Sequence, residues 1–406
     1  MKTVWNSPNK EREILGLIQS RVALSRAELV DLTGLSAGLI SAVVRRLIAN
    51  GLVVESGLQP SKLGRRRVVL QLSPATAYTM GLEIGTYFLR VAVNDLAGNV
   101  CFKAQTQTIL SEGFSRVMER CFQLIDEAIR GARISKDDLV AIGVAHSGVV
   151  DSNRGLVLSF PRPGQMSEWK NVPLRDIVEQ RCKVPCVIED SVRMAALAEK
   201  QIGAATELSD FVYVRIGMGI GACIFIDGEP YRGAGGSAGE FGHMTVDENG
   251  PLCFCGNSGC LSALASGSAI IQAVASALHK GVQSRIQEMI DGDLARIHIE
   301  MILQAAAEND SLAFRVLSDA AVHIGVALAD VINLLNPDVI VFSGPLFQTD
   351  SQLMLESIKR VIRQRALEKA ANEVKLMISA LGAEAAAAGA ARFAASKVIA
   401  SVPPGS

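Results

Sequence analysis

Apolar residues near the start of the chain recur at helical spacing in three short segments, 11–20, 26–33 and 37–50. Ser25 precedes the second segment, and Glu28 follows three residues later, which is the spacing of a capping box. Glycine follows the second and the third segment, where each helix is expected to stop. Two helices joined by a tight glycine-containing turn are typical of a helix-turn-helix unit.

A strand pair is predicted after these helices, at 52–55 and 67–72, with a basic tip between the strands. The resulting winged helix would place the third helix in the major groove, N-terminal end first, and the tip near a minor groove. A three-helix interaction module is the alternative. The predicted DNA-contacting residues are Ser36, Ala37, Ser41, Arg45, Lys62, Arg65, Arg66 and Arg67.

The rest of the chain alternates strands and helices. A strand, a turn and a second strand occupy 81–93, and the same form returns at 211–226 around a glycine-rich turn. Helices are predicted at 114–131 and 192–201, and a buried strand at 139–145. This alternation indicates an α/β body, and the repeated opening suggests two similar lobes around a cleft.

Composition agrees with a soluble globular protein: the 406 residues are 49% hydrophobic and 20% charged, with a net charge of −1. Charge breaks the apolar runs before 18 residues and the first ten residues are polar, so we expect neither a membrane span nor a signal peptide, and a cytoplasmic location. Residues 1–72 hold eleven Lys and Arg against five Asp and Glu. A basic head favours a polyanionic partner, although a solvated basic face is the alternative.

Three of the eight cysteines fall within eight residues, at Cys253, Cys255 and Cys260, and His243 lies ten residues before the first. Three thiolates and one imidazole complete a closed tetrahedral site for structural Zn²⁺. A disulfide is disfavoured in a reducing compartment, which leaves three buried free thiols as the alternative.

The body resembles the ROK family of repressors, open reading frames and sugar kinases, and the added winged helix is similar to its repressor branch. The residues that carry the resemblance are Gly239-Glu-Phe-Gly-His243 and Cys253-Phe-Cys-Gly-Asn-Ser-Gly-Cys260. It implies an α/β fold with a winged helix-turn-helix head and a two-lobed actin-like sugar-kinase body. The domains expected are a head at 1–72, a linker at 73–80, a first lobe at 81–190, and a second lobe at 191–406 that carries the zinc site and a dimerisation surface, its last helix returning to the first lobe.

The resemblance also implies that phosphoryl transfer is lost. The first phosphate-binding turn of the family corresponds to Glu83-Ile-Gly-Thr-Tyr-Phe88, where Tyr and Phe replace a threonine and a lysine. The second turn, Gly217-Met-Gly-Ile-Gly221, has Met218 in place of a hydroxyl residue. Ser191 takes the position of the catalytic aspartate, and a serine alone is not a base at neutral pH. We therefore expect no enzymatic activity.

Sugar contacts of the family correspond to Glu240 and His243, with Asn171 and Asp190 as further candidates, whereas the family's last glutamate is Ser262 here. The expected protein is a repressor of carbohydrate genes that binds operator DNA as a homodimer or dimer of dimers and responds to a small sugar-like effector. A bifunctional sugar kinase with a DNA-binding head is one alternative. A repressor controlled by a protein partner is another.

Overall fold

The computed structural model describes residues 9–20, 24–59, 67–74, 77–160, 168–347 and 352–401. Contacts among them divide the chain into two compact units. The first contains the head, the body up to residue 202 and the segment from 384 onward, and the second contains the described residues between 203 and 383. The lobe boundary that was expected at residues 190 and 191 thus lies after residue 202.

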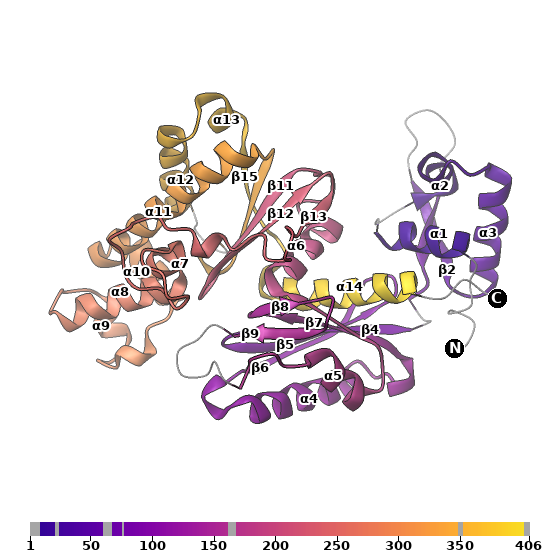
Figure 1. The fold of residues 1–406 in the computed structure, drawn as a ribbon, viewed down its shortest axis with the longest axis horizontal. Helices are drawn as coiled ribbons and strands as arrows, with labels where there is room; N and C mark the ends of the chain where they lie inside the picture. Colours follow the sequence, from indigo (N-terminus) through magenta and orange to yellow (C-terminus); the bar gives the residue numbers. More distant parts are fainter. Residues whose placement is uncertain are drawn as a thin grey trace. The chain divides into compact units, whose positions relative to one another are not determined.

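The described residues of the head form the three predicted helices and the two predicted strands in the expected order, together with a short strand, β1, that was not predicted (Figure 1). They are α1 (Asn9–Ser20), β1 (Leu24–Ser25), α2 (Arg26–Thr33), α3 (Ala37–Ala49), β2 (Val53–Gln59) and β3 (Arg67–Leu72). The strands form an antiparallel sheet in the order β1-β3-β2. The tip of the predicted wing, with Lys62, Arg65 and Arg66, lies outside the described residues.

Local hydrogen bonds explain where α2 and α3 begin. Glu28 N–H donates to Ser25 Oγ at 3.4 Å and Ser25 N–H donates to Glu28 Oε2 at 2.7 Å, which confirms the capping box. Ser36 Oγ accepts from Leu39 N–H at 3.4 Å and caps α3. Gly34 ends α2 with φ 66°, a backbone conformation that only glycine adopts without strain.

The head packs directly on the body. Its apolar core includes Ile40, Val44 and Leu70 of the head, together with Ala77 and Leu96 from beyond it. Residues 78–80, which were expected in a linker, already belong to the first strand of the body. Burial of apolar surface therefore continues from the head into the first lobe.

The first lobe is built on a five-stranded sheet of order β10-β7-β4-β5-β6. Its strands are β4 (Tyr78–Ile84), β5 (Phe88–Asp95), β6 (Val100–Gln107), β7 (Leu139–His146) and β10 (Cys186–Asp190), with a small hairpin of β8 (Val149–Asp151) and β9 (Leu156–Ser159). Its helices are α4 (Phe114–Gly131), α5 (Leu174–Cys182), α6 (Ser191–Ile202) and α14 (Ala385–Ser401). Strands β7 and β10 run parallel to β4, whereas β5 and β6 continue antiparallel.

Helix α14 lies against this sheet unusually closely because small residues meet at the contact (Figure 1). A Cβ added to Gly81 on β4 would stand 1.8 Å from the Ala387 carbonyl oxygen, and one added to Gly143 on β7 would stand 2.0 Å from that of Ala390. Any side chain at these glycines would push the helix off the sheet. The C-terminal helix thus belongs to the first lobe although it ends the chain.

The second lobe repeats the same sheet plan with the order β13-β12-β11-β14-β15. Its strands are β11 (Phe211–Ile216), β12 (Ile220–Ile226), β13 (Glu229–Tyr231), β14 (Val339–Ser343) and β15 (Lys375–Ile378). Its helices are α7 (Leu261–Ala265), α8 (Gly267–His279), α9 (Ile286–Met289), α10 (Ile299–Ala307), α11 (Ser311–Leu335), α12 (Gln352–Arg365) and α13 (Glu368–Glu373). In each sheet three consecutive strands are antiparallel and two further strands run parallel to the first of them, so the two-lobed fold expected from the repeated strand–turn–strand form is confirmed.

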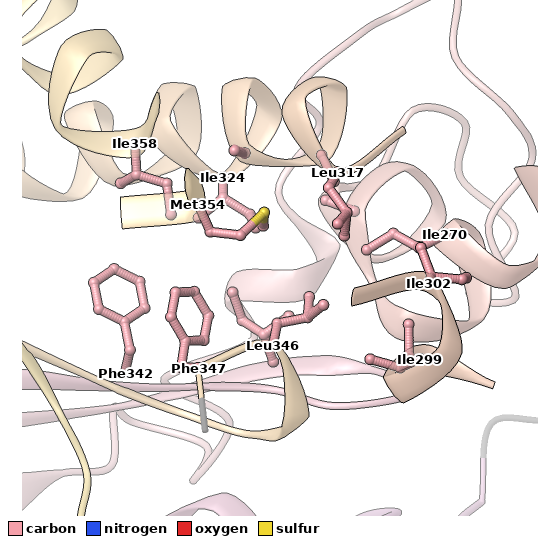
Figure 2. Packing of buried hydrophobic residues seen from close by; sticks show 14 of the residues in the cluster. Ile270, Ile299, Ile302, Leu317, Ile324, Phe342, Leu346, Phe347, Met354 and Ile358 are labelled. Atoms are coloured by element: carbon pink, nitrogen blue, oxygen red, sulfur yellow. The ribbon is translucent and has the colours of Figure 1, made fainter. Parts of the chain in front are cut away.

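Isoleucines and phenylalanines fill the core of the second lobe (Figure 2). Ile324 and Ile358, from α11 and α12, face the stacked rings of Phe342 and Phe347, whose centroids are 4.6 Å apart. Helix α11 is long and apolar enough to cross a membrane, but 61% of its most apolar window is buried in this core. That is the behaviour of a core helix.

Candidate functional site

The predicted metal ligands come together at one end of the second lobe's hairpin. His243 closes the 3₁₀ turn η4 (Phe241–His243), and the segment 253–260 folds back beside it through isolated bridges between Thr245 and Cys260 and between Leu252 and Ser258. Gly259 permits this fold, since its φ is 68° and a Cβ there would stand 1.5 Å from the Asp247 carbonyl oxygen.

The four donor atoms of His243, Cys253, Cys255 and Cys260 all lie within 4.8 Å of one another. Cys253 Sγ is 3.6 Å from His243 Nδ1, and Cys255 Sγ is 3.6 Å from Cys260 Sγ. These separations are too long for a disulfide and suit four ligands around one cation. The cluster is one that could bind a metal ion.

Electrostatics inside the cluster favour a cation. The backbone N–H of Asn257 lowers the pKa of Cys255. Burial, together with the adjacent thiols of Cys255 and Cys253, raises the pKa of Cys260 to about 12. Thiolates this close repel one another, so all three can be deprotonated together only with a positive charge between them.

The candidate DNA face is the exposed side of α3, from its N-cap Ser36 to Arg45. Ser36, Ala37 and Arg45 are exposed and Ser41 is half-buried, whereas the opposite side of the helix is buried in the head. Arg45 Nε donates to the Ser41 carbonyl at 3.3 Å, which holds the guanidinium along the exposed surface. Arg67, at the base of the wing, is also exposed. Among the described head residues, Arg45 and Arg67 are therefore exposed cations that a phosphate could reach.

The candidate ligand residues divide between the lobes. Glu240 and His243 lie on the second lobe in a single turn, where the His243 N–H donates to the Glu240 carbonyl at 3.0 Å and the Glu240 side chain is exposed. Asn171 and Asp190 lie on the first. Asn171 is exposed and has a left-handed backbone (φ 55°), and Asp190 Oδ1 caps α6 by accepting from Arg193 N–H at 2.9 Å.

A buried polar network surrounds the position where the family has its catalytic aspartate. Ser191 is only 4% exposed, and its hydroxyl lies 3.3 Å from that of Ser147. Glu189 Oε1 is 2.5 Å from Arg193 Nη1 and accepts from Ser152 Oγ at 2.8 Å. Sequence reasoning missed this network. The spacing of four residues between Glu189 and Arg193 was the available signal.

A second buried group also went unnoticed in the sequence. His146 Nδ1 accepts from Gly148 N–H at 2.8 Å, which leaves its other ring nitrogen, Nε2, as the donor. Neither His146 Nε2 nor the indole N–H of Trp169 has a hydrogen-bond partner among the described residues. The rings lie 5.3 Å apart, and burial lowers the pKa of His146 to about 3. This histidine is therefore neutral at physiological pH.

Both candidate phosphate turns are closed by their own side chains. In the first, Glu83 is 1% exposed and pairs with Arg90 at 3.0 Å, and the Arg90 guanidinium lies 5.1 Å from the centroid of the Phe88 ring. In the second, the sulfur of Met218 lies against Gly267, 3.3 Å from where a Cβ would stand, and Ser268 Oγ donates to the Met218 carbonyl. Side chains of the protein thus contact both candidate turns.

Comparison with known proteins identifies the chain. A model of the ROK family matches residues 79–397, and a model of winged helix-turn-helix DNA-binding domains matches residues 9–54. The chain belongs to the ROK family. The xylose repressor of Caldicellulosiruptor bescii is 30% identical to this ROK protein over 91% of the chain and 90% of its own length. The transcriptional dual regulator NagC of Escherichia coli K12 is 32% identical over 87% of this chain and 84% of its own length.

Two solved structures agree with this assignment. A ROK family transcriptional regulator, a homologue of the E. coli MLC protein, is 29% identical, covers 95% of this chain and 96% of its own, and superposes with a TM-score of 0.75. A ROK glucokinase from Streptomyces griseus, solved with glucose and AMPPNP, is 28% identical. The match covers 78% of this chain and 99% of the glucokinase, with a TM-score of 0.70. The family and fold that the sequence predicted are confirmed.

Proposed function

We propose that this ROK protein is a repressor of carbohydrate genes that binds operator DNA through its head and releases it when its body binds a sugar. The observation that carries the proposal is the presence, in one chain, of a winged-helix head with an exposed recognition helix and a ROK body. The names of the relatives, which include xylose repressors and an N-acetylglucosamine repressor, support the same role.

Operator contacts are assigned to the exposed N-terminal turn of α3 and to the wing. Ser36, Ala37 and Ser41 are small, which lets the backbone approach the major groove, and Arg45 can reach a guanine edge or a phosphate. Lys62, Arg65, Arg66 and Arg67 supply the cations of the wing.

Sugar contacts are assigned to Glu240 and His243 on the second lobe and to Asn171 and Asp190 on the first. Glu240 offers two carboxylate oxygens to hydroxyl groups, and its exposure leaves them accessible. The Asp190 carboxylate already accepts one backbone N–H, so it would meet the sugar with its remaining acceptor positions. D-xylose and N-acetylglucosamine are the first candidates, because relatives bear those names.

Loss of phosphoryl transfer is part of the proposal. Ser191 stands where the family has its base, and its hydroxyl is buried against Ser147. No strong base therefore faces an attacking sugar hydroxyl at this position. Arg90, which pairs with Glu83, and Met218, which packs against Gly267, occupy the turns that would hold phosphates.

The cysteine cluster is proposed to hold a structural Zn²⁺. Zn–S bonds of about 2.3 Å and a Zn–N bond of about 2.0–2.1 Å in a tetrahedron place neighbouring donors about 3.5–3.8 Å apart. The distances of 3.6 Å from Cys253 Sγ to His243 Nδ1 and from Cys255 Sγ to Cys260 Sγ agree with that arrangement. Bound there, the ion would fix the turn that carries Glu240.

We further propose that the protein is cytoplasmic and acts as a homodimer, or a dimer of dimers, through its second lobe. A helix-turn-helix protein reads a two-fold operator with two heads spaced by turns of the DNA helix, which requires at least two chains.

The deciding experiment is an operator titration with the full-length protein. Operators are first selected from a random duplex pool, and the complexes are then titrated with D-xylose, N-acetylglucosamine and D-glucose, while ATP turnover is measured with each sugar. Release by one sugar without turnover supports the proposal. Turnover would identify a bifunctional sugar kinase, and tight operator binding that no sugar affects would favour control by a protein partner.

A further inference from the structure

Arg392 is a buried charge in a helix whose preceding turns consist of alanine and glycine. Its Nε donates to Gln201 Oε1 at 2.7 Å, its Nη1 to the Gly98 carbonyl at 3.4 Å and its Nη2 to the Gln19 carbonyl at 3.5 Å. Gln19 Nε2 in turn donates to the Arg392 carbonyl at 3.2 Å. The side chain is 7% exposed, so these contacts are shielded from water.

The three partners of Arg392 belong to three different parts of the first unit. Gln19 lies in the last turn of α1, in the head (Figure 1). Gly98 lies in the turn between β5 and β6, and Gln201 in the last turn of α6. One guanidinium thus joins the DNA-binding head, the sheet of the first lobe and helix α6.

Helix α6 connects this junction to the proposed sugar site. It begins directly after Asp190, and Gln201 lies ten residues beyond Ser191, a helical distance of about 15 Å. Its contact with α14 is tight, because a Cβ added to Gly389 would stand 1.9 Å from the Met194 carbonyl oxygen. Because α6 is rigid and packs tightly on α14, a displacement of its Asp190 end is transmitted to Arg392.

The joint beside Arg392 contains unpaired polar groups. Thr79 and Asn94 are opposite one another on β4 and β5, and each side chain is 1% exposed. The Thr79 hydroxyl and both polar atoms of the Asn94 amide have no hydrogen-bond partner among the described residues. They line a cavity with Gln19 and Arg392 that is too narrow for a water molecule. Unpaired buried polar groups raise the free energy of the arrangement in which α1 is docked. They favour an arrangement in which the joint opens and water reaches these groups.

We propose that Arg392 is the positioning residue that couples the sugar site to the DNA-binding head: it clamps α1 to α6 in the arrangement seen here, and a sugar-driven shift of α6 alters this clamp. The coupling rests on the proposed function, but the clamp itself can be tested without sugar. Allostery requires an element with two arrangements that both sites bias, and in this proposal the joint between α1 and α14 is that element.

The test compares Arg392→Met and Gln19→Ala with a matched control, Ser396→Ala, in the full chain. Ser396 lies on the same helix, but its hydroxyl bonds only locally, to the Phe393 carbonyl. Without sugar, hydrogen exchange of the amides in residues 9–20 should become about tenfold faster in both joint variants and remain unchanged in Ser396→Ala. Arg392→Lys, which keeps the charge but not the forked donors, should restore part of the protection.

With D-xylose or N-acetylglucosamine, whichever releases the wild type, Arg392→Met should reduce the sugar-induced loss of operator affinity about fivefold or more. Sugar affinity, measured by calorimetry, should stay within about threefold, because Arg392 does not belong to the proposed sugar site. Unchanged exchange in residues 9–20 together with an unchanged sugar response would overturn the proposal. If neither sugar affects the wild type, the proposed function fails, and the exchange comparison still decides whether Arg392 clamps the head.

Discussion

Glu189 and Arg193 form a buried ion pair at the junction of β10 and α6, with Glu189 Oε1 2.5 Å from Arg193 Nη1 and side-chain exposures of 0% and 7%. The pair lies beside Ser191, the residue proposed to replace the base of the family's kinases. A carboxylate and a guanidinium that neutralise each other in a dry environment stabilise this junction only while both are present.

Removing one member of the pair should therefore be costly. Arg193→Met is expected to lower the free energy of unfolding by about 3–5 kcal/mol, because it leaves the Glu189 charge buried without its ion-pair partner. The double variant Glu189→Leu/Arg193→Met should recover part of the loss. Urea denaturation followed by circular dichroism measures both.

Arg116→Met is the matched control for this comparison, since Arg116 pairs with Glu119 on the exposed surface of α4. Its stability should equal that of the wild type. A single Arg193→Met variant as stable as the control would contradict the assigned role of the buried pair.

His146 should make the stability of the first lobe depend on pH. Burial lowers its pKa to about 3 in the folded protein, whereas the unfolded chain titrates near the ordinary value of about 6.5. Between these pKa values His146 is protonated in the unfolded state and neutral in the folded state. The free energy of unfolding is therefore highest above about pH 6.5 and falls by up to about 1.4 kcal/mol per pH unit below pH 6.5. Denaturation curves between pH 4 and pH 8 measure this slope.

His146→Asn is the control for that slope. Its amide oxygen can accept the Gly148 N–H in place of Nδ1, but the side chain does not titrate. The variant should show a shallower pH dependence than the wild type over the same range. Equal slopes would show that folding does not lower the pKa of His146.

The head was largely predictable because its signals are local. Ser25, Glu28, Gly34 and Ser36 act within four residues along the chain, so helix boundaries could be placed within about two residues. The cysteine cluster was predictable for the same reason, since its three thiols fall within eight residues. Short-range spacing carries this information without knowledge of the fold.

Contacts between distant segments could not be predicted in this way. Arg392 meets Gln19 across 373 positions, and no periodicity near either residue indicates the other. The linker expected at 73–80 was misplaced because Ala77 is buried by the head as well as by the body, a property of the packing between them. The pairing of Glu83 with Arg90 required the register of β4 and β5. Such features depend on tertiary structure.

Metal removal should destabilise the second lobe. Zn²⁺ binding requires deprotonated thiols, and burial holds the pKa of Cys260 at about 12 without the ion, so binding releases protons and weakens as pH falls. We expect one zinc per chain and a loss of several kcal/mol of stability in Cys255→Ala. Cys101→Ala, an exposed cysteine outside the cluster, is the control. Absence of zinc from freshly purified protein would contradict the assignment.

Operator binding should depend on the cations of the head. Arg45→Ala and Arg67→Ala are expected to weaken operator binding about 5- to 100-fold and to reduce its dependence on salt. With one phosphate contact fewer, binding releases fewer counterions from the DNA. Arg26→Ala is a control on the same head, since Arg26 pairs with Glu55 at 2.8 Å. Fluorescence anisotropy between 50 and 200 mM salt measures the slopes. If Arg26→Ala alters the slope as strongly as Arg45→Ala, the contact face is placed wrongly.

Glu240→Ala should uncouple sugar from DNA while leaving DNA binding intact. Charge-assisted hydrogen bonds from sugar hydroxyls to its carboxylate contribute about 1.5–3 kcal/mol each, so their loss weakens sugar binding by at least about tenfold. The backbone bond from His243 N–H to the Glu240 carbonyl survives the substitution, so the turn and its metal ligand should stay in place. Operator affinity without sugar should therefore equal that of the wild type, and zinc content should be unchanged. Glu248→Ala, an exposed carboxylate five residues beyond His243, should respond to sugar normally. If D-xylose or N-acetylglucosamine releases the operator equally from Glu240→Ala and from the wild type, the effector site lies elsewhere. In this comparison only Glu240→Ala alters a proposed sugar contact.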